Sequence, residues 1–285
     1  FLLGMGNHVF WGDEAYTAIL GRNILRSGYP TAWDGRNLLA YNAGAPLNKG
    51  LVEVQLPWVQ YYAAAAGLAV FGENAVAGRL PFAAMGVATV VALYFLALRL
   101  GRSRAFAFGC ATALAAWVPF LLFARQCRYY APAMLAAVVM FHLWLDLSLK
   151  RRGRLALFVA ASVFFFHSQF LMFACFFAAL VLADVILERR RERLVALLVS
   201  VPLIVAFTLP WVLAVGTPDD PQGRVLANAH PANWFRLFLL HLRDYNRGGL
   251  FPVLMLVPLG MFAKPTLRRR KETARALAPG ALVLL

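Results

Sequence analysis

The hydrophobic positions of this chain fall into long uninterrupted runs separated by short basic clusters. A membrane-spanning helix needs about 20 apolar residues to cross a hydrocarbon core about 30 Å thick. Nearly uncharged runs predict six spanning helices between residues 80 and 215: Leu80–Leu98, Ala105–Ala124, Tyr129–Leu149, two within 155–187, and Leu194–Val215. The pattern therefore predicts an all-α fold, a polytopic transmembrane helical bundle.

The run Leu155–Leu187 is the one whose interpretation depends on charge. Its 33 residues are too many for one span and give two short ones. Basic clusters at 150–154 and 189–193 flank it, and cytoplasmic loops carry an excess of Lys and Arg. Both ends are therefore expected on the cytoplasmic side, with a hairpin that turns near residues 167–169.

The residues before the first full span are mixed, aromatic-rich and too polar to cross a bilayer. The apolar run Phe1–Phe10 is too short to span and is expected to be the outer end of a truncated helix. Residues 11–79 then form the first extracytoplasmic loop, with short amphipathic helices over Asp13–Leu25 and Pro57–Phe71. The Ser27-Gly28-Tyr29-Pro30 stretch is a strong stop signal for the first of them.

Residues 1–285 are expected to form a single domain that is truncated at both ends. After the six spans we expect a second extracytoplasmic loop over 216–249 and further transmembrane helices over 250–285. The composition agrees with this plan, because 61% of the residues are hydrophobic, 14% are charged and the mean hydropathy is +0.66. A soluble domain is excluded by these values. The cysteines, Cys110, Cys127 and Cys175, have no spacing that indicates disulfides or a zinc site.

The net charge of +15 is distributed unevenly between the two predicted sides of the membrane. The clusters at 99–104, 150–154, 189–193 and 264–275 lie on the side with 17 basic and 5 acidic residues, whereas the other side has 11 and 8. The net charges are +12 and +3, so the first side is cytoplasmic. The basic residues do not gather on one solvated face, so no nucleic acid partner is expected. We expect a multi-pass inner (plasma) membrane protein whose site faces the periplasm or the exterior.

Two adjacent acids, Asp13 and Glu14, follow the first apolar run directly. One interpretation is a helix cap, because carboxylates are favoured near the positive N-terminus of a helix. The other is a reactive pair at the outer membrane surface. These two residues alone do not decide between the interpretations.

A short outer turn carries Arg125 and Arg128, on the side where the positive-inside rule disfavours cations. Arginine can hold a phosphate at headgroup depth through two parallel hydrogen bonds. The alternative is that these side chains only extend toward the lipid headgroups. The predicted turn near 167 also faces outward, although a lone histidine such as His167 is more often structural than reactive.

The outer segments resemble the GT-C glycosyltransferases of the protein O-mannosyltransferase and aminoarabinose transferase type. The first outer loop of that family is similar to Asp13-Glu14-Ala15-Tyr16 with Arg22-Asn23-Ile24-Leu25 and Gly28. Later parts of the same resemblance are Leu56-Pro57-Trp58-Val59-Gln60-Tyr61-Tyr62, Phe71-Gly72-Glu73, Ala77-Gly78-Arg79-Leu80-Pro81 and Arg125-Gln126-Cys127-Arg128-Tyr129. The similarity covers roughly residues 11–170, and the order of the motifs is more specific than any one of them.

The resemblance implies transfer of a sugar from a polyprenyl phosphate donor to a glycan, lipid or protein acceptor, with inversion at the sugar carbon. Asp13 would be the general base, with Glu14 tuning its basicity or orienting the acceptor. The donor phosphate would be held by Arg125, Arg128, Arg22 and Lys49. Lys49 is included because this chain has Leu56 where many members have a basic residue or a histidine. The sugar and acceptor pocket would be formed by Tyr16, Glu53, Trp58, Gln60, Tyr129, His167 and Gln169.

Elementary chemistry agrees with these roles. A sugar hydroxyl is a poor nucleophile, so a carboxylate must accept its proton as the new bond forms. The departing phosphate gains negative charge, which fixed cations stabilise. No metal site is expected from a recognised ligand pattern, although Asp13, Glu14 and Glu53 could hold a divalent cation through their oxygens.

Two other classes of protein remain open at this point. A carrier or flippase would place ionisable groups along a substrate path at mid-bilayer. The main candidates inside the runs, Asp146 and Asp184, lie near the predicted cytoplasmic ends. A purely structural membrane subunit would leave the outer polar residues unexplained.

Overall fold

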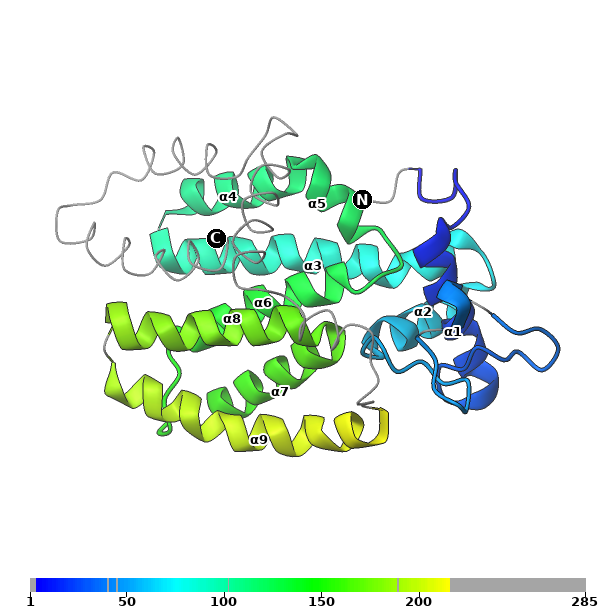
Figure 1. The fold of residues 1–285 in the computed structure, drawn as a ribbon. Coiled ribbons are helices and arrows are strands. Elements are labelled where there is room, and N and C mark those ends of the chain that lie inside the picture. The colour runs from blue at the N-terminus through cyan, green and yellow to red at the C-terminus, as the bar shows by residue number, and fades with distance from the viewer. Residues whose placement is uncertain (1–3, 40, 45, 102, 189, 216–285) are drawn as a thin grey trace, which may run out of the picture.

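A computed structural model describes residues 4–39, 41–44, 46–101, 103–188 and 190–215 (Figure 1). The helices within these ranges are α1 (Gly12–Ser27), α2 (Val59–Phe71), α3 (Ala75–Gly101), α4 (Arg104–Ala116), α5 (Val118–Ala124), α6 (Tyr130–Trp144), α7 (Arg152–Ser168), α8 (Phe170–Ala183) and α9 (Arg191–Val215). A 3-10 turn, η1 (Tyr41–Gly44), and a π-helical turn, η2 (Asp184–Glu188), complete the helical elements. The predictions for 216–285 lie outside the described residues.

The all-α prediction is confirmed, and helices occupy all six runs predicted between residues 80 and 215. Within the described chain two helices are long and apolar enough to cross a membrane alone, Ala75–Gly101 and Arg191–Ala214. The others are shorter or broken, and α7 begins in the basic cluster. The described β-structure consists of three isolated bridges in the segment between α1 and α2.

The run Ala105–Ala124 was expected to be one spanning helix, whereas the structure breaks it into two helices. It forms α4 and α5, which are bent by 69° at Trp117. Pro119 is the cause, because its ring removes one backbone donor and collides with the carbonyl four residues earlier. Trp117 consequently adopts an extended conformation, with φ −76° and ψ 111°.

The hairpin prediction for 155–187 is confirmed. Helix α7 ends at Ser168 and α8 begins at Phe170, with Gln169 between them in extended conformation. The Gln169 side chain accepts a hydrogen bond from the Leu171 amide at 3.4 Å. The predicted pocket residue therefore caps α8.

Helices α1 and α2 and the segment that joins them lie together at one end of the bundle (Figure 1). Helix α1 ends at the predicted stop, where Gly28 adopts the left-handed conformation with φ 82°. Gly21 allows α2 to approach closely, since an added Cβ would lie 2.9 Å from the Ala64 Cβ. The helices bury Tyr16, Leu20 and Tyr61 between them. This packing fixes the first turn of α1, where the acids lie, relative to the bundle.

A second core joins α6, α7, α8 and α9 around Met140, Trp144 and Phe158. At its edge the Asp184 carboxylate accepts a hydrogen bond from the Arg193 Nε at 2.6 Å and another from the Trp144 Nε1 at 2.8 Å. The Arg193 guanidinium also stacks 4.0 Å from the Trp144 ring centroid. Asp184 is thus paired inside the packed core rather than placed along an open path.

Candidate active site at one end of the bundle

Asp13 lies in the first turn of α1 with its side chain one quarter exposed. The N-cap residue is Trp11, so neither Asp13 nor Glu14 caps the helix. The Tyr41 hydroxyl donates a hydrogen bond to Asp13 Oδ1, and the Arg128 Nη2 lies 3.3 Å from Asp13 Oδ2. Each carboxylate oxygen therefore has a donor, while a carboxylate offers about four lone-pair directions. Asp13 keeps the capacity to accept a further hydrogen bond from a substrate.

Arg128 reaches Asp13 from the turn between α5 and α6. Its side chain is only 9% exposed, and its guanidinium carbon lies 5.2 Å from the Tyr129 ring centroid. The Nη1 group is 3.5 Å from the Asp13 carbonyl oxygen. The Nε group is buried and has no hydrogen-bond partner among the residues that the structure describes. The guanidinium therefore has a donor left to offer to a bound anion.

Glu14 points away from Asp13 and forms a buried, two-pronged ion pair with Arg79 of α3. The Arg79 Nε and Nη2 donate to the two Glu14 oxygens at 3.0 and 2.5 Å. The Cys127 backbone amide adds a third hydrogen bond to Glu14 at 2.9 Å. Because the Glu14 side chain is only 2% exposed, these contacts hold together α1, α3 and the turn that carries Arg128.

Arg79 was not among the predicted site residues, although it belongs to one of the motifs that carry the resemblance. Its guanidinium also donates hydrogen bonds to the backbone carbonyls of Met5, His8 and Val9. An arginine at the start of an apolar run needs a buried partner. That rule signals that a carboxylate must be near Arg79, but the sequence does not say which one.

Glu53 is a second buried carboxylate near Asp13. It accepts a hydrogen bond from the Tyr16 hydroxyl and two from the backbone amides of Gln55 and Leu56, at 2.8 and 2.9 Å. Burial raises the pKa of Glu53, and the three hydrogen bonds oppose this shift. The Tyr16 ring stacks on Tyr41, 4.4 Å between centroids. Glu53 is thus connected to the Tyr41 that contacts Asp13.

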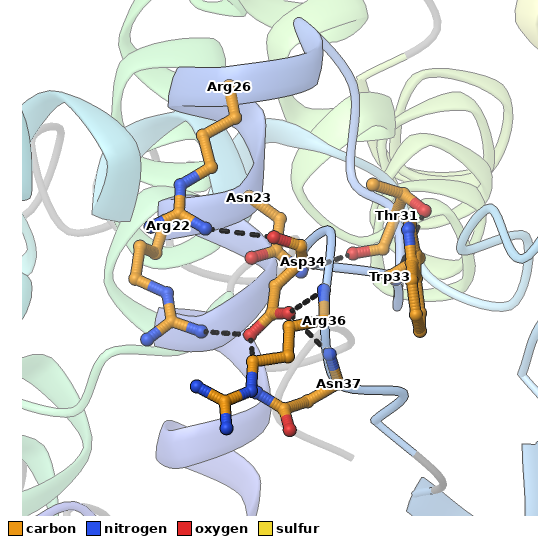
Figure 2. Close-up of polar contacts among 8 residues, drawn as sticks. All are labelled: Arg22, Asn23, Arg26, Thr31, Trp33, Asp34, Arg36 and Asn37. Atoms are coloured by element: carbon orange, nitrogen blue, oxygen red, sulfur yellow. Dashed lines mark hydrogen bonds and ion pairs between the residues drawn. The ribbon is translucent and has the colours of Figure 1, made fainter.

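The remaining cations predicted to hold phosphate lie in different surroundings. Arg22 forms an ion pair with Asp34 at 3.1 Å (Figure 2). The backbone amides of Asn37 and Arg36 lower the pKa of Asp34 to about 2. Lys49 is exposed on a turn between η1 and α2, and Arg125 is half-buried directly after α5.

Further predicted pocket residues lie around these groups. The Tyr129 ring is tilted by 46° against that of Tyr130, with 4.4 Å between the ring centroids. Gln60 is fully buried at the start of α2, and its Nε2 is 3.5 Å from the Pro57 carbonyl oxygen. The Trp58 Nε1 donates to the Glu53 carbonyl at 2.9 Å. Trp58 is therefore fixed to the same loop as Glu53.

An apolar cavity of about 530 Å³ lies between α2, α3, α7 and α9. Its lining residues are Trp58, Val59, Tyr62, Ala63, Met85, Phe164, His167 and Trp211. The structure thus brings together Trp58 and His167, two predicted pocket residues that are far apart in the sequence. The His167 ring lies edge-on to Trp211, 5.7 Å between centroids.

The three carboxylates considered for a divalent cation have different partners. Asp13 pairs with Arg128, Glu14 with Arg79, and Glu53 with Tyr16. In the part of the chain that the structure describes, no group of three or more His, Cys, Asp or Glu side chains could hold a metal ion. The divalent cation therefore stays a prediction without a described site.

Comparison with solved structures places this arrangement on a known fold. The chain aligns with the crystal structure of ArnT from Cupriavidus metallidurans bound to undecaprenyl phosphate, at a TM-score of 0.59 and 19% sequence identity. The chain shares the fold of the aligned part of ArnT. The apo structure of the same ArnT gives a TM-score of 0.59 at 20% identity. The likeness to ArnT confirms the fold that the resemblance implied.

The alignments cover 99% and 97% of this chain but only 56% and 55% of ArnT. The chain therefore spans just over half the length of the ArnT structures. No protein-family model matches the sequence, and no curated protein matches it. At this level of identity the ArnT likeness concerns the fold, and the chemistry rests on the residues described above.

Proposed function

We propose that this protein is a glycosyltransferase that moves a sugar from a polyprenyl-phosphate donor to an acceptor hydroxyl at the extracytoplasmic membrane face. The observation that carries the proposal is the pairing of the Asp13 carboxylate with the Arg128 guanidinium at 3.3 Å, on an ArnT fold. A proton acceptor and a phosphate-binding cation are the two groups that this reaction needs side by side.

Asp13 is the general base of the proposed reaction. As the acceptor oxygen bonds to the anomeric carbon, the hydroxyl proton passes to Asp13 and the bond from that carbon to the phosphate oxygen breaks. Attack opposite the leaving phosphate inverts the anomeric configuration. The Tyr41 hydroxyl, bound to Asp13 Oδ1, orients the carboxylate for this proton transfer.

Arg128 is the group proposed to stabilise the leaving phosphate. Negative charge develops on the phosphate oxygen as the bond breaks, and a fixed guanidinium in a buried setting stabilises that charge without reorganising. The Arg128 Nε, which is buried and has no hydrogen-bond partner among the described residues, is the donor proposed for this purpose. Arg125, in the same turn, is the second candidate.

Three further groups act as positioning residues in this proposal. The ion pair of Glu14 with Arg79 fixes the first turn of α1 against α3 and against the Arg128 turn. Glu53 fixes Tyr16, which stacks on Tyr41. The proposed role of Glu14 is therefore to hold Asp13 in place, since its carboxylate is buried and already accepts three hydrogen bonds.

The apolar cavity beside α2 supports a lipid-linked donor. Its volume of about 530 Å³ and its aromatic lining suit isoprenoid units rather than a free sugar. Trp58 lines the cavity and is also hydrogen-bonded to Glu53, so the cavity adjoins the polar site. One of the ArnT structures contains undecaprenyl phosphate, which supports the same class of lipid here.

The test is to incubate the full-length protein with a panel of polyprenyl phosphate sugars and to measure transfer to an acceptor or hydrolysis to free sugar. The Asp13→Asn variant is the control for contaminating enzymes. Product formation by the parent and not by the variant supports the proposal. Vesicle transport of the same lipids by both proteins, without product, would favour the carrier.

A further inference from the structure

Three arginines converge on one carboxylate at the end of the bundle away from α1. Asp146, just after α6, accepts a hydrogen bond from the Arg154 Nη1 at 2.7 Å and forms an ion pair with Arg99. The Arg151 Nη1 lies 3.6 Å from the same carboxylate. Arg99 also donates to the His142 carbonyl at 2.9 Å. The ends of α3 and α6 and the start of α7 therefore meet in one polar cluster.

This cluster carries more positive charge than Asp146 can neutralise. Three guanidinium groups against one carboxylate leave two positive charges in excess. The first turn of α7 contains no acidic residue that would offset this excess. The N-terminus of a helix is itself the positive end of its dipole, where anions are favoured and cations are not. An additional anion would therefore relieve repulsion at this place.

The cluster is accessible to such an anion from the membrane surface. The Arg151 side chain is 62% exposed, and that of Asp146 is 38% exposed, whereas Arg99 and Arg154 are about one quarter exposed. Fixed guanidinium groups at the ends of membrane-spanning helices lie at the depth of lipid phosphates. Arginine can offer two parallel donors to a phosphate.

We propose that Arg99, Arg151 and Arg154 form a binding site for the phosphate headgroup of an anionic phospholipid, on the membrane face opposite Asp13. This site is separate from the proposed transferase site and does not depend on its chemistry. Asp146 acts as the fixed anion that gathers the three arginines, and the lipid phosphate supplies the second. Basic pockets of this kind between transmembrane helices bind anionic lipid headgroups.

The test measures lipid retention by native mass spectrometry of the detergent-solubilised full-length protein. Phosphatidylglycerol is titrated against phosphatidylcholine, for the parent and for Arg151→Gln. The matched control is Arg152→Gln, which removes the same charge from an exposed neighbour one position along α7. Arg151 is the most exposed of the three arginines, so its replacement leaves the fold intact, and thermal unfolding checks this.

The expected result is that the parent retains phosphatidylglycerol over phosphatidylcholine. Arg151→Gln should bind phosphatidylglycerol about fivefold more weakly, and Arg152→Gln should stay close to the parent. Equal losses in the two variants would mean that the lipid responds only to overall charge, and the site would be refuted. Soluble glycerol phosphate or inorganic phosphate that competes at the same concentration as the lipid would identify a free anion as the ligand, and would overturn the lipid assignment.

Discussion

The Arg128 Nη2 lies 3.3 Å from the Asp13 Oδ2, although the two residues are 115 positions apart. The contact joins the first turn of α1 to the turn between α5 and α6. A charge pair this far apart in sequence needs a scaffold, and the buried hydrogen bond from the Cys127 amide to Glu14 supplies it. Asp13 and Glu14 therefore have different roles, which can be distinguished by substituting each residue in turn.

Asp13→Asn should abolish most turnover and leave the fold unchanged. Asparagine keeps the size and much of the hydrogen bonding of Asp13 but cannot take up the proton. Turnover at saturating donor should fall by about 10²–10⁴-fold, the usual contribution of a general base. Donor binding should survive, and the unfolding temperature should fall less than in Glu14→Gln, because the Asp13 side chain is one quarter exposed whereas that of Glu14 is buried. Full activity in this variant would mean that Asp13 is not the general base and would contradict the proposed mechanism.

Arg128→Ala should weaken binding of the lipid donor, and Arg128→Lys should restore it only in part. An ammonium group keeps the charge but not the paired donors of the guanidinium. The measurement is donor affinity by titration, with turnover recorded alongside. Arg22→Ala is the control, since Arg22 is an arginine of α1 that pairs with Asp34. Equal affinity in all four proteins would mean that Arg128 does not contact the donor.

Glu14→Gln should reduce stability rather than chemistry. The substitution leaves the Arg79 guanidinium buried without its charge partner, and breaking a buried ion pair in this way costs about 3–5 kcal/mol. The unfolding temperature in detergent should fall clearly, while the activity per folded molecule should fall far less than in Asp13→Asn, because Glu14 only positions the base. Wild-type stability combined with lost turnover would instead assign Glu14 to the reaction.

The sequence predicts the helices well because their signals are local. The stop at Gly28 and the turn near 167–169 agree with the structure, because each depends on a few neighbouring residues. The ends of the apolar runs are less exact, since α3 begins at Ala75 rather than Leu80 and α6 ends at Trp144 rather than Leu149. The bend at Trp117 was missed although its cause is also local. Pro119 lies within a run that is otherwise uniformly apolar. The prediction counted consecutive apolar residues, and such a count does not detect that proline lacks a backbone N–H donor.

The partners of the site residues could not be predicted, because they depend on contacts between distant segments. Asp13 and Glu14 are adjacent and chemically alike, yet α1 directs one toward Arg128 and the other toward Arg79. Successive residues on a helix point about 100° apart, so adjacent side chains face different neighbours. Tyr41 comes from a loop without periodicity, and no sequence signal indicates that its hydroxyl reaches Asp13.

Glu53 should make stability depend on pH in a direction that burial determines. Burial raises the pKa of Glu53 above its usual 4.5, so the folded protein holds this proton more tightly than the unfolded chain does. The resulting stability is fully present below pH 4.5 and is lost as the pH rises through the raised pKa. The Glu53→Gln variant does not titrate there. The unfolding temperature of Glu53→Gln should therefore increase relative to that of the parent as the pH rises toward neutrality. A difference between the two unfolding temperatures that does not change with pH would contradict the raised pKa of Glu53.

The side of the membrane that Asp13 faces can be tested at the turn between α7 and α8. Ser168 is fully buried, so Gln169, which is partly exposed, is the better position for a single cysteine, with Arg191 at the start of α9 as the opposite position. Cys110, Cys127 and Cys175 must first be replaced. A membrane-impermeant maleimide should label Gln169→Cys in intact cells and Arg191→Cys only after permeabilisation, because the basic residues around Arg191 favour the cytoplasmic side. The reverse pattern would place Asp13 in the cytoplasm and would require a donor sugar on the inner leaflet.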